Sequence, residues 1–89
     1  MPITVLVADD HAIVREGLAT LLASQPDIEV IGTAASGREA LVQVLLLKPQ
    51  VAILDISMPE LNGIEATRQI IEKIPDMNIV VLSMHSSAG

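Results

Sequence analysis

The chain has 89 residues and lacks Phe, Trp and Tyr although 51% of it is hydrophobic, so we expect one small domain over residues 1–89 with an aliphatic core. The net charge of −6 without a Lys/Arg cluster argues against direct nucleic acid binding, and the absence of cysteine excludes disulfides and thiolate catalysis. No apolar run approaches the roughly 20 residues of a membrane span, so we expect a cytoplasmic location without membrane contact.

Short apolar runs alternate with segments of helical periodicity along the chain. Residues 4–8 are predicted to form the first strand. The helix that follows begins near Ala12 and ends at residues 25–27. Its core face is predicted to carry five residues, which are Val14, Gly17, Leu18, Leu21 and Leu22.

A second strand is predicted at residues 29–34. Ser36 and Glu39 have the spacing of a capping box, which predicts the start of the second helix, and Pro49 closes that helix. The apolar positions of this helix divide into a core stripe and an outer pair. The stripe is Ala40, Leu41, Val44 and Leu47, and the outer pair is Val42 and Leu46.

The second half of the chain repeats this alternation. Residues 51–54 are predicted as the third strand, and Asn62 caps the third helix with Glu65 at the capping-box position. The sheet-facing residues of that helix are predicted to be Ile64, Ile70, Ile71 and Ile74. Residues 78–83 form the fourth predicted strand. Right-handed crossovers then give an α/β fold with a parallel sheet of order 2-1-3-4, the flavodoxin-like arrangement without its last strand.

Three aspartates follow strands of this sheet. Asp9 and Asp10 come directly after the first strand, and Asp55 ends the third. Side chains just past the carboxyl ends of neighbouring parallel strands face one crevice, so these carboxylates are expected to converge. Such a cluster persists if it is protonated, paired with basic groups or built to hold a hard cation such as Mg²⁺. The pattern therefore indicates a magnesium-assisted phosphoryl site.

Asp55 is the expected phosphoacceptor, because a carboxylate can attack phosphorus and hold the phosphoryl group as an acyl phosphate. Each carboxylate also has a structural alternative. Asp55 could be a strand-end residue that merely caps a turn, and Asp10 could be the N-cap of the first helix. Ser83 ends the fourth strand, where its hydroxyl could donate to a phosphoryl oxygen, or it could be a plain turn serine. His11 and His85 have no third ligand at metal-binding spacing and are interpreted as solvated or capping residues.

The motifs around these residues resemble the receiver domain of two-component response regulators. They are LVADDH at 6–11, LDISMP at 54–59, NG at 62–63 and VVLS at 80–83. Two further stretches, REGL at 15–18 and AASGREAL at 34–41, resemble the NarL/FixJ type, whose members usually carry a C-terminal helix-turn-helix DNA-binding domain. The resemblance implies the CheY-like receiver fold and a role in transcription regulation.

The resemblance also implies a role for each of these residues. Asp55 would receive the phosphoryl group from a histidine kinase, and Ser83 would contact it as the switch residue. Asp10, Asp55 and the backbone carbonyl of Ser57 would bind Mg²⁺ directly, while Asp9 would hold a metal-bound water. The implied function is that of a phosphoacceptor signalling module rather than an enzyme.

The sequence departs from the family pattern at two points. A receiver has five strands with a lysine before the fifth, and neither Lys48 nor Lys73 corresponds to it, so we expect a receiver truncated before its fifth strand. Met84 follows Ser83 where the family usually has a small residue. One alternative is therefore a phosphorylation-incompetent dimerisation domain. An aspartyl-nucleophile phosphatase is less compatible, because it would need Asp-x-Asp after strand one.

A truncated sheet would leave the fourth strand as an apolar edge, which templates pairing with another chain. We therefore expect a homo-oligomer in which strand four, the tail from Met84 and the face of the first helix around Val14 and Leu18 meet a second copy. Solvated roles without chemistry are expected for Arg15, Arg38 and Arg68.

Overall fold

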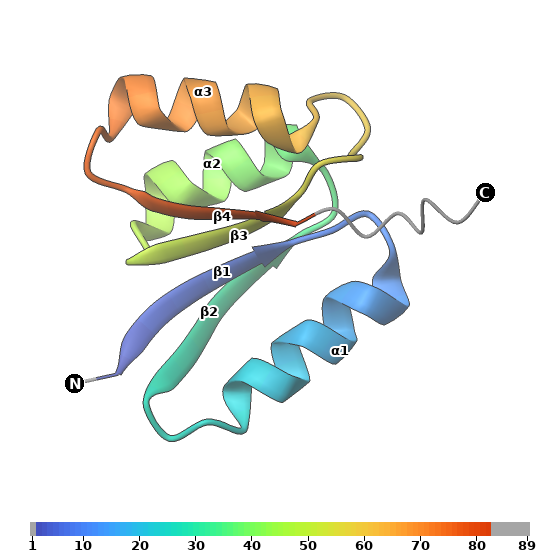
Figure 1. Cartoon of the computed structure of the whole chain (residues 1–89), viewed down its shortest axis with the longest axis vertical. Coiled ribbons are helices and arrows are strands. Elements are labelled where there is room, and N and C mark those ends of the chain that lie inside the picture. Colours follow the sequence, from blue (N-terminus) through green and yellow to red (C-terminus); the bar gives the residue numbers. More distant parts are fainter. Residues whose placement is uncertain (1, 83–89) are drawn as a thin grey trace.

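The computed structural model describes residues 2–82, which form a four-stranded sheet with helices on both faces (Figure 1). The elements in chain order are β1 (Ile3–Ala8), α1 (Ala12–Ala23), β2 (Ile28–Ala34), α2 (Gly37–Leu47), β3 (Val51–Asp55), α3 (Gly63–Lys73) and β4 (Asn78–Leu82). The strand order is β2-β1-β3-β4, and each neighbouring pair is parallel. The predicted α/β fold and its strand order 2-1-3-4 are therefore confirmed.

The main core lies between the sheet and the helices α2 and α3, which cover the same face (Figure 1). It contains only aliphatic side chains and Met58, and its largest fully buried members are Leu6, Leu54, Ile70 and Val44. Burial of such a side chain contributes about 1.5–3 kcal/mol relative to exposure. An aliphatic core was the expectation from a sequence without aromatic residues.

Helix α1 lies alone on the opposite face, where it contacts β1 and β2 (Figure 1). Val5 and Val7 of β1 are buried on this side, because successive strand residues alternate between the two faces. Within the described part of the chain, α1 itself has no fully buried residue. No helix within residues 2–82 is long and apolar enough to cross a membrane.

Helix α2 begins and ends where the sequence predicts. The Ser36 hydroxyl accepts a hydrogen bond from the Glu39 N–H at 3.1 Å, and the Glu39 carboxylate accepts one from the Ala35 N–H at 2.8 Å. The Glu39 carboxylate thus bonds to Ala35, the residue before the N-cap, and not to Ser36 itself. Lys48 then takes a left-handed conformation (φ 49°), and Pro49 cannot continue the helix.

Helix α3 has the predicted cap, since Asn62 Oδ1 accepts from the Glu65 N–H at 2.8 Å. The Glu65 carboxylate pairs with Arg68 at 2.6 Å. The predicted core position of Ile64 is wrong: the residue is 60% exposed. At 100° per residue it lies about 120° around the helix from the buried Ile70, so both cannot face the sheet.

The predicted core faces fail at four further positions, of which the first is Gly17 on α1: it is exposed, and an added Cβ would meet nothing within 4 Å. Leu21 and Leu47 are exposed, and each lies in the last turn of its helix, where no following turn shields it. Ile71 is also exposed, about 100° around α3 from Ile70. The outer pair on α2, Val42 and Leu46, is exposed as predicted.

Candidate functional site

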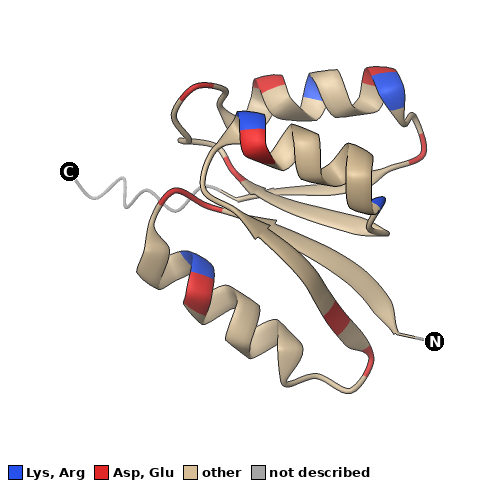
Figure 2. Cartoon of the chain, turned by 180° about the vertical axis from the view of Figure 1, so that it is seen from behind, with Lys and Arg blue, Asp and Glu red and all other residues tan. Residues whose placement is uncertain are grey.

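The three aspartates meet at one edge of the sheet. Asp9 and Asp10 follow β1, Asp55 is the last residue of β3, and these neighbouring strands pair in parallel up to Ala8 and Leu54. Figure 2 shows acidic positions, in red, where the two strands end. One ligand atom from each aspartate and from His11 lies within 4.8 Å of the others. The predicted convergence at the carboxyl ends of the strands is therefore confirmed.

Two of these carboxylates are taken out of solvent. Asp9 is 1% exposed and Asp55 is 2% exposed. Neither side-chain oxygen of Asp55 has a hydrogen-bond partner among residues 2–82. A buried carboxylate without donors is costly to keep charged, so it needs a cation or a proton. The cluster around Asp55 could therefore hold a metal ion.

His11 is drawn into this cluster. Its ring Nδ1 lies 3.1 Å from Asp9 Oδ1 and 3.1 Å from Asp10 Oδ1, and its backbone N–H donates to Asp9 Oδ1 at 2.8 Å. The hydrogen bond to Asp9, followed by the charge of Asp10, raises the pKa of His11 above its ordinary value of 6.5. Because carboxylate oxygens only accept, Nδ1 carries the proton in these contacts.

The structure corrects the interpretation of the first turn of α1. The N-cap residue is His11 and not Asp10, which removes the capping alternative for Asp10. The His11 side chain makes no capping hydrogen bond and faces the carboxylates instead. Sequence reasoning therefore missed a candidate ligand. Its only signal was its position directly after the Asp pair.

Arg15 also has a contact that the sequence did not predict. Its Nη1 donates to the backbone carbonyl oxygen of Asp9 at 2.9 Å, while the Asp9 N–H donates to the Ala34 carbonyl at 3.0 Å. These bonds fix the turn that carries the first two carboxylates. Arg15 is thus a positioning residue, and the prediction of a purely solvated role was wrong.

The turn after β3 is equally constrained. A Cβ atom on Gly63 would overlap the backbone carbonyl of Asp55, and the Gly63 N–H donates to the Ile56 carbonyl at 2.9 Å. Ser57 is half-buried in this turn, two residues beyond Asp55. Its role as a carbonyl ligand stays a prediction. Ser83, Met84 and His85 lie outside the described residues.

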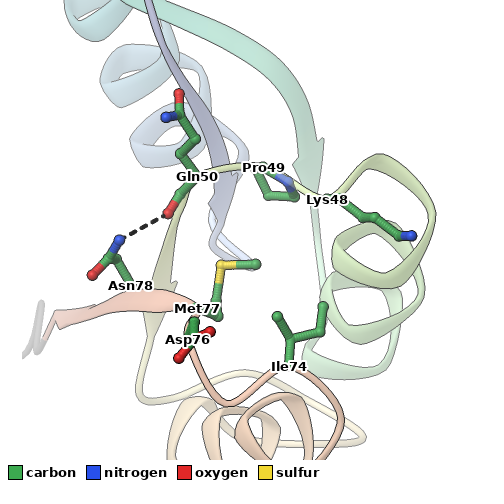
Figure 3. A pocket seen from close by; sticks show the side chains of 7 residues that line it. All are labelled: Lys48, Pro49, Gln50, Ile74, Asp76, Met77 and Asn78. Atoms are coloured by element: carbon green, nitrogen blue, oxygen red, sulfur yellow. Dashed lines mark hydrogen bonds between the residues drawn. The ribbon is translucent and has the colours of Figure 1, made fainter.

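A separate pocket of about 430 Å³ opens at the other end of β3 and β4 (Figure 3). Pro49, Ile74 and Met77 form much of its wall, and the Asn78 amide donates to the Gln50 carbonyl at 3.4 Å across its rim. Ligands of open parallel sheets bind at the carboxyl ends of the strands, whereas this pocket lies at the amino ends. The carboxylate cluster therefore remains the candidate site.

Comparison with known proteins agrees with this geometry. Residues 5–89 match the family described as response regulator receiver domain. The transcriptional regulatory protein YhcZ of Bacillus subtilis is 48% identical over 82 residues, which cover 92% of this chain and 38% of that protein. The chain thus spans well under half the length of that relative.

Two solved structures show the same fold. The signal receiver domain of the response regulator NarL from Mycobacterium tuberculosis has a TM-score of 0.90 at 29% identity, over 98% of this chain and 70% of that one. The CheX–CheY–BeF₃–Mg²⁺ complex from Borrelia burgdorferi has a TM-score of 0.86 at 27% identity, over 99% of this chain and 66% of that one. With the carboxylate cluster at the ends of β1 and β3, these likenesses show that the chain belongs to the receiver domain family of response regulators, with relatives of the NarL/LuxR type.

Proposed function

We propose that the chain is a phosphoacceptor module that takes a phosphoryl group from a sensor histidine kinase onto Asp55. The observation that carries the proposal is the buried Asp55 carboxylate, which has no hydrogen-bond partner within residues 2–82 and lies beside Asp9 and Asp10. A structural turn cap would use its oxygens to accept backbone N–H bonds. This carboxylate has both oxygens available for chemistry.

In the proposed step, an Asp55 side-chain oxygen attacks the phosphorus of a phosphohistidine on the kinase. A new O–P bond gives an acyl phosphate as the P–N bond breaks. The leaving nitrogen takes the bonding electron pair, and the kinase ring, protonated on its other nitrogen, departs as neutral imidazole. The Ser83 hydroxyl is proposed to contact the transferred group as a switch residue.

The residues fit a magnesium ion, since the donor set includes several carboxylate oxygens. Asp10, Asp55 and the Ser57 carbonyl would hold the ion, and Asp9 would hold one of its waters. When bound, Mg²⁺ neutralises charge on the transferring oxygens. The CheX–CheY complex contains BeF₃ together with Mg²⁺, which supports a Mg²⁺ ion beside a bound phosphoryl group in this chain. Arg15 and the β1–α1 turn keep Asp9 and Asp10 in position.

The output is proposed to be transcription regulation through an attached DNA-binding domain. YhcZ is a transcriptional regulatory protein, and this chain matches 38% of its length. The net charge of −6 gives the described domain itself little attraction for nucleic acid. Like other receivers, the chain would act as a signalling module that is modified, rather than as a free-standing phosphatase.

The test is incorporation of phosphate from a small acyl phosphate donor, followed by intact-protein mass spectrometry with and without Mg²⁺. Wild type should gain one phosphoryl group only when Mg²⁺ is present, and Asp55→Asn should gain none. Asp27→Asn, in the exposed α1–β2 turn, is the matched control and should behave as wild type. Equal labelling of Asp55→Asn would overturn the assignment.

A second candidate function is an interaction domain that works by self-association without phosphorylation. It is favoured by β4, which is an edge strand of the described sheet and carries the exposed Val80. The helix face named for this contact needs correction, because Val14 and Leu18 are half-buried. The exposed large apolar residues of α1 are Ile13 and Leu21. A wild-type chain that dimerises but takes up no phosphate would favour this candidate.

A further inference from the structure

Among residues 2–82, the carboxylate cluster contains one nitrogen donor, the His11 ring. His11 Nδ1 lies 3.1 Å from an oxygen of Asp9 and 3.1 Å from an oxygen of Asp10. The ring therefore sits among the oxygens that the proposed function assigns to a cation. Its atom nearest the carboxylates is Nδ1, a ring nitrogen that can bind a metal once the metal has displaced its proton.

The spacing of the donors suits a single ion. Ligands about 2.0–2.2 Å from one ion are at most about 4.4 Å apart, because two opposite bonds set the limit. The candidate ligand atoms of Asp9, Asp10, His11 and Asp55 lie within 4.8 Å of one another. A contraction of a few tenths of an ångström would therefore bring the His11 nitrogen into the coordination shell of an ion held by Asp10 and Asp55, with Asp9 beside it through a water.

A second observation points independently to a ligand. Asp55 is 98% buried, since only 2% of it is exposed, and both of its carboxylate oxygens lack partners within residues 2–82. One of these oxygens belongs to the same group of donors. The cluster is therefore more than a set of exposed acidic residues, because the Asp55 carboxylate is removed from water and no hydrogen bond within residues 2–82 replaces its contacts with water.

The His11 ring can bind a metal ion without breaking a capping hydrogen bond to α1. It occupies the N-cap of α1, yet its side chain makes no capping hydrogen bond to the helix. Its backbone is held separately, because its N–H donates to Asp9 Oδ1 at 2.8 Å. The ring is largely exposed, so it can rotate by small angles while the backbone stays in place.

We propose that His11 is a nitrogen ligand of this cation site and gives it a preference for divalent first-row transition metal ions, such as Co²⁺ and Ni²⁺, over Mg²⁺. Mg²⁺ takes oxygen ligands, whereas imidazole suits the transition metals, whose affinities rise along the series towards Cu²⁺. The inference rests on the proposed function, since it concerns the same site. It adds how a His11 ligand would rank other divalent ions against Mg²⁺ at that site.

The experiment measures Co²⁺, Ni²⁺ and Mg²⁺ affinity of the whole chain by calorimetric titration at a pH of about 8, where a free imidazole is neutral. Visible absorption of bound Co²⁺ and broadening of imidazole proton signals report nitrogen ligation directly. His11→Gln keeps a polar side chain but removes the ring nitrogen. Thr20→Gln, at an exposed position of α1, is the control for a polar substitution, and circular dichroism checks that each variant is folded.

We expect His11→Gln to lower Co²⁺ and Ni²⁺ affinity by at least about tenfold and to change Mg²⁺ affinity by less than about twofold. Thr20→Gln should match wild type, and Asp55→Asn should weaken the binding of all three ions. If Asp55→Asn weakens binding but His11→Gln leaves the Co²⁺ to Mg²⁺ ratio unchanged, the His11 inference is overturned and the proposed site stands. If wild type binds none of the ions, both fail.

Discussion

Gly63 and Asp55 lie in direct backbone contact, and no side chain fits between them: a Cβ atom on Gly63 would overlap the Asp55 carbonyl oxygen. This contact brings the start of α3 against the end of β3. It fixes the short turn that carries Ser57 next to the proposed phosphoacceptor. The backbone packing of a loop thus sets the geometry of the site.

Gly63→Ala should destabilise the domain by about 1–3 kcal/mol, because the methyl group must push the turn away from β3. Urea denaturation monitored by circular dichroism measures the free energy of unfolding. The control is Gly17→Ala in α1, where a Cβ meets nothing within 4 Å. That change should stabilise by about 0.5–1 kcal/mol, because alanine has the higher helix propensity. Equal effects of the two substitutions would contradict the contact.

Asp55→Asn should have opposite effects with and without magnesium. In EDTA the variant should unfold at a higher temperature than wild type, because a buried carboxylate without partners is replaced by a neutral side chain of similar size. In Mg²⁺ the wild type should gain thermal stability through binding to the folded state, and the variant should gain less. A lower melting temperature of Asp55→Asn in EDTA would indicate that the carboxylate is already compensated.

Arg15→Ala should destabilise the domain by about 1–2 kcal/mol, since it removes a charged hydrogen bond to the Asp9 carbonyl in a half-buried position. Mg²⁺ affinity should fall as well, because the turn carrying Asp9 and Asp10 loses a restraint. Arg38→Ala on the exposed face of α2 is the matched arginine control and should leave Mg²⁺ affinity unchanged. If both variants lose Mg²⁺ affinity equally, the loss does not come from the Asp9 contact, and it cannot be a charge effect either, because removal of a positive charge by itself favours binding of a cation.

The His11 ring should titrate above 6.5 in the metal-free protein. Because its folded pKa is raised, the protonated ring contributes stability that is fully present below pH 6.5 and is lost as the pH rises through the folded value. Proton NMR of the imidazole measures this pKa directly. Asp9→Asn should lower it most, since the hydrogen bond to Asp9 is the largest cause, and Asp10→Asn should lower it less. The reverse order would assign the main contact to Asp10.

Self-association through β4 predicts that Val80→Lys shifts the chain towards monomer, because a charged residue on an edge strand opposes pairing. Light scattering at micromolar concentration measures the molar mass of wild type and variant. Leu46→Lys is a control at an exposed apolar position on α2, far from the edge in sequence and on another element. A wild-type chain that is monomeric under these conditions would rule out the β4 contact.

The sequence by itself determined the fold class, the strand order and the meeting of three carboxylates. Each depends on short-range signals: apolar runs set the strands, and Ser36 and Asn62 cap the helices that they were predicted to cap. The rule that parallel strands present their carboxyl ends at one edge then placed Asp55 beside Asp9. Each of these signals involves residues that are close together in the chain, so it can be recognised without knowing how the helices and strands pack.

Only the tertiary structure decided which side chains are buried and which pair across the site. The exposure of Ile64 depends on how α3 is rotated against the sheet, and the contact of Arg15 with Asp9 depends on the turn between β1 and α1. The same turn faces His11 towards two carboxylates, while Asp55 is buried without partners among residues 2–82. These relationships join groups whose distance is set by packing in three dimensions, and no pattern along the chain specifies that distance.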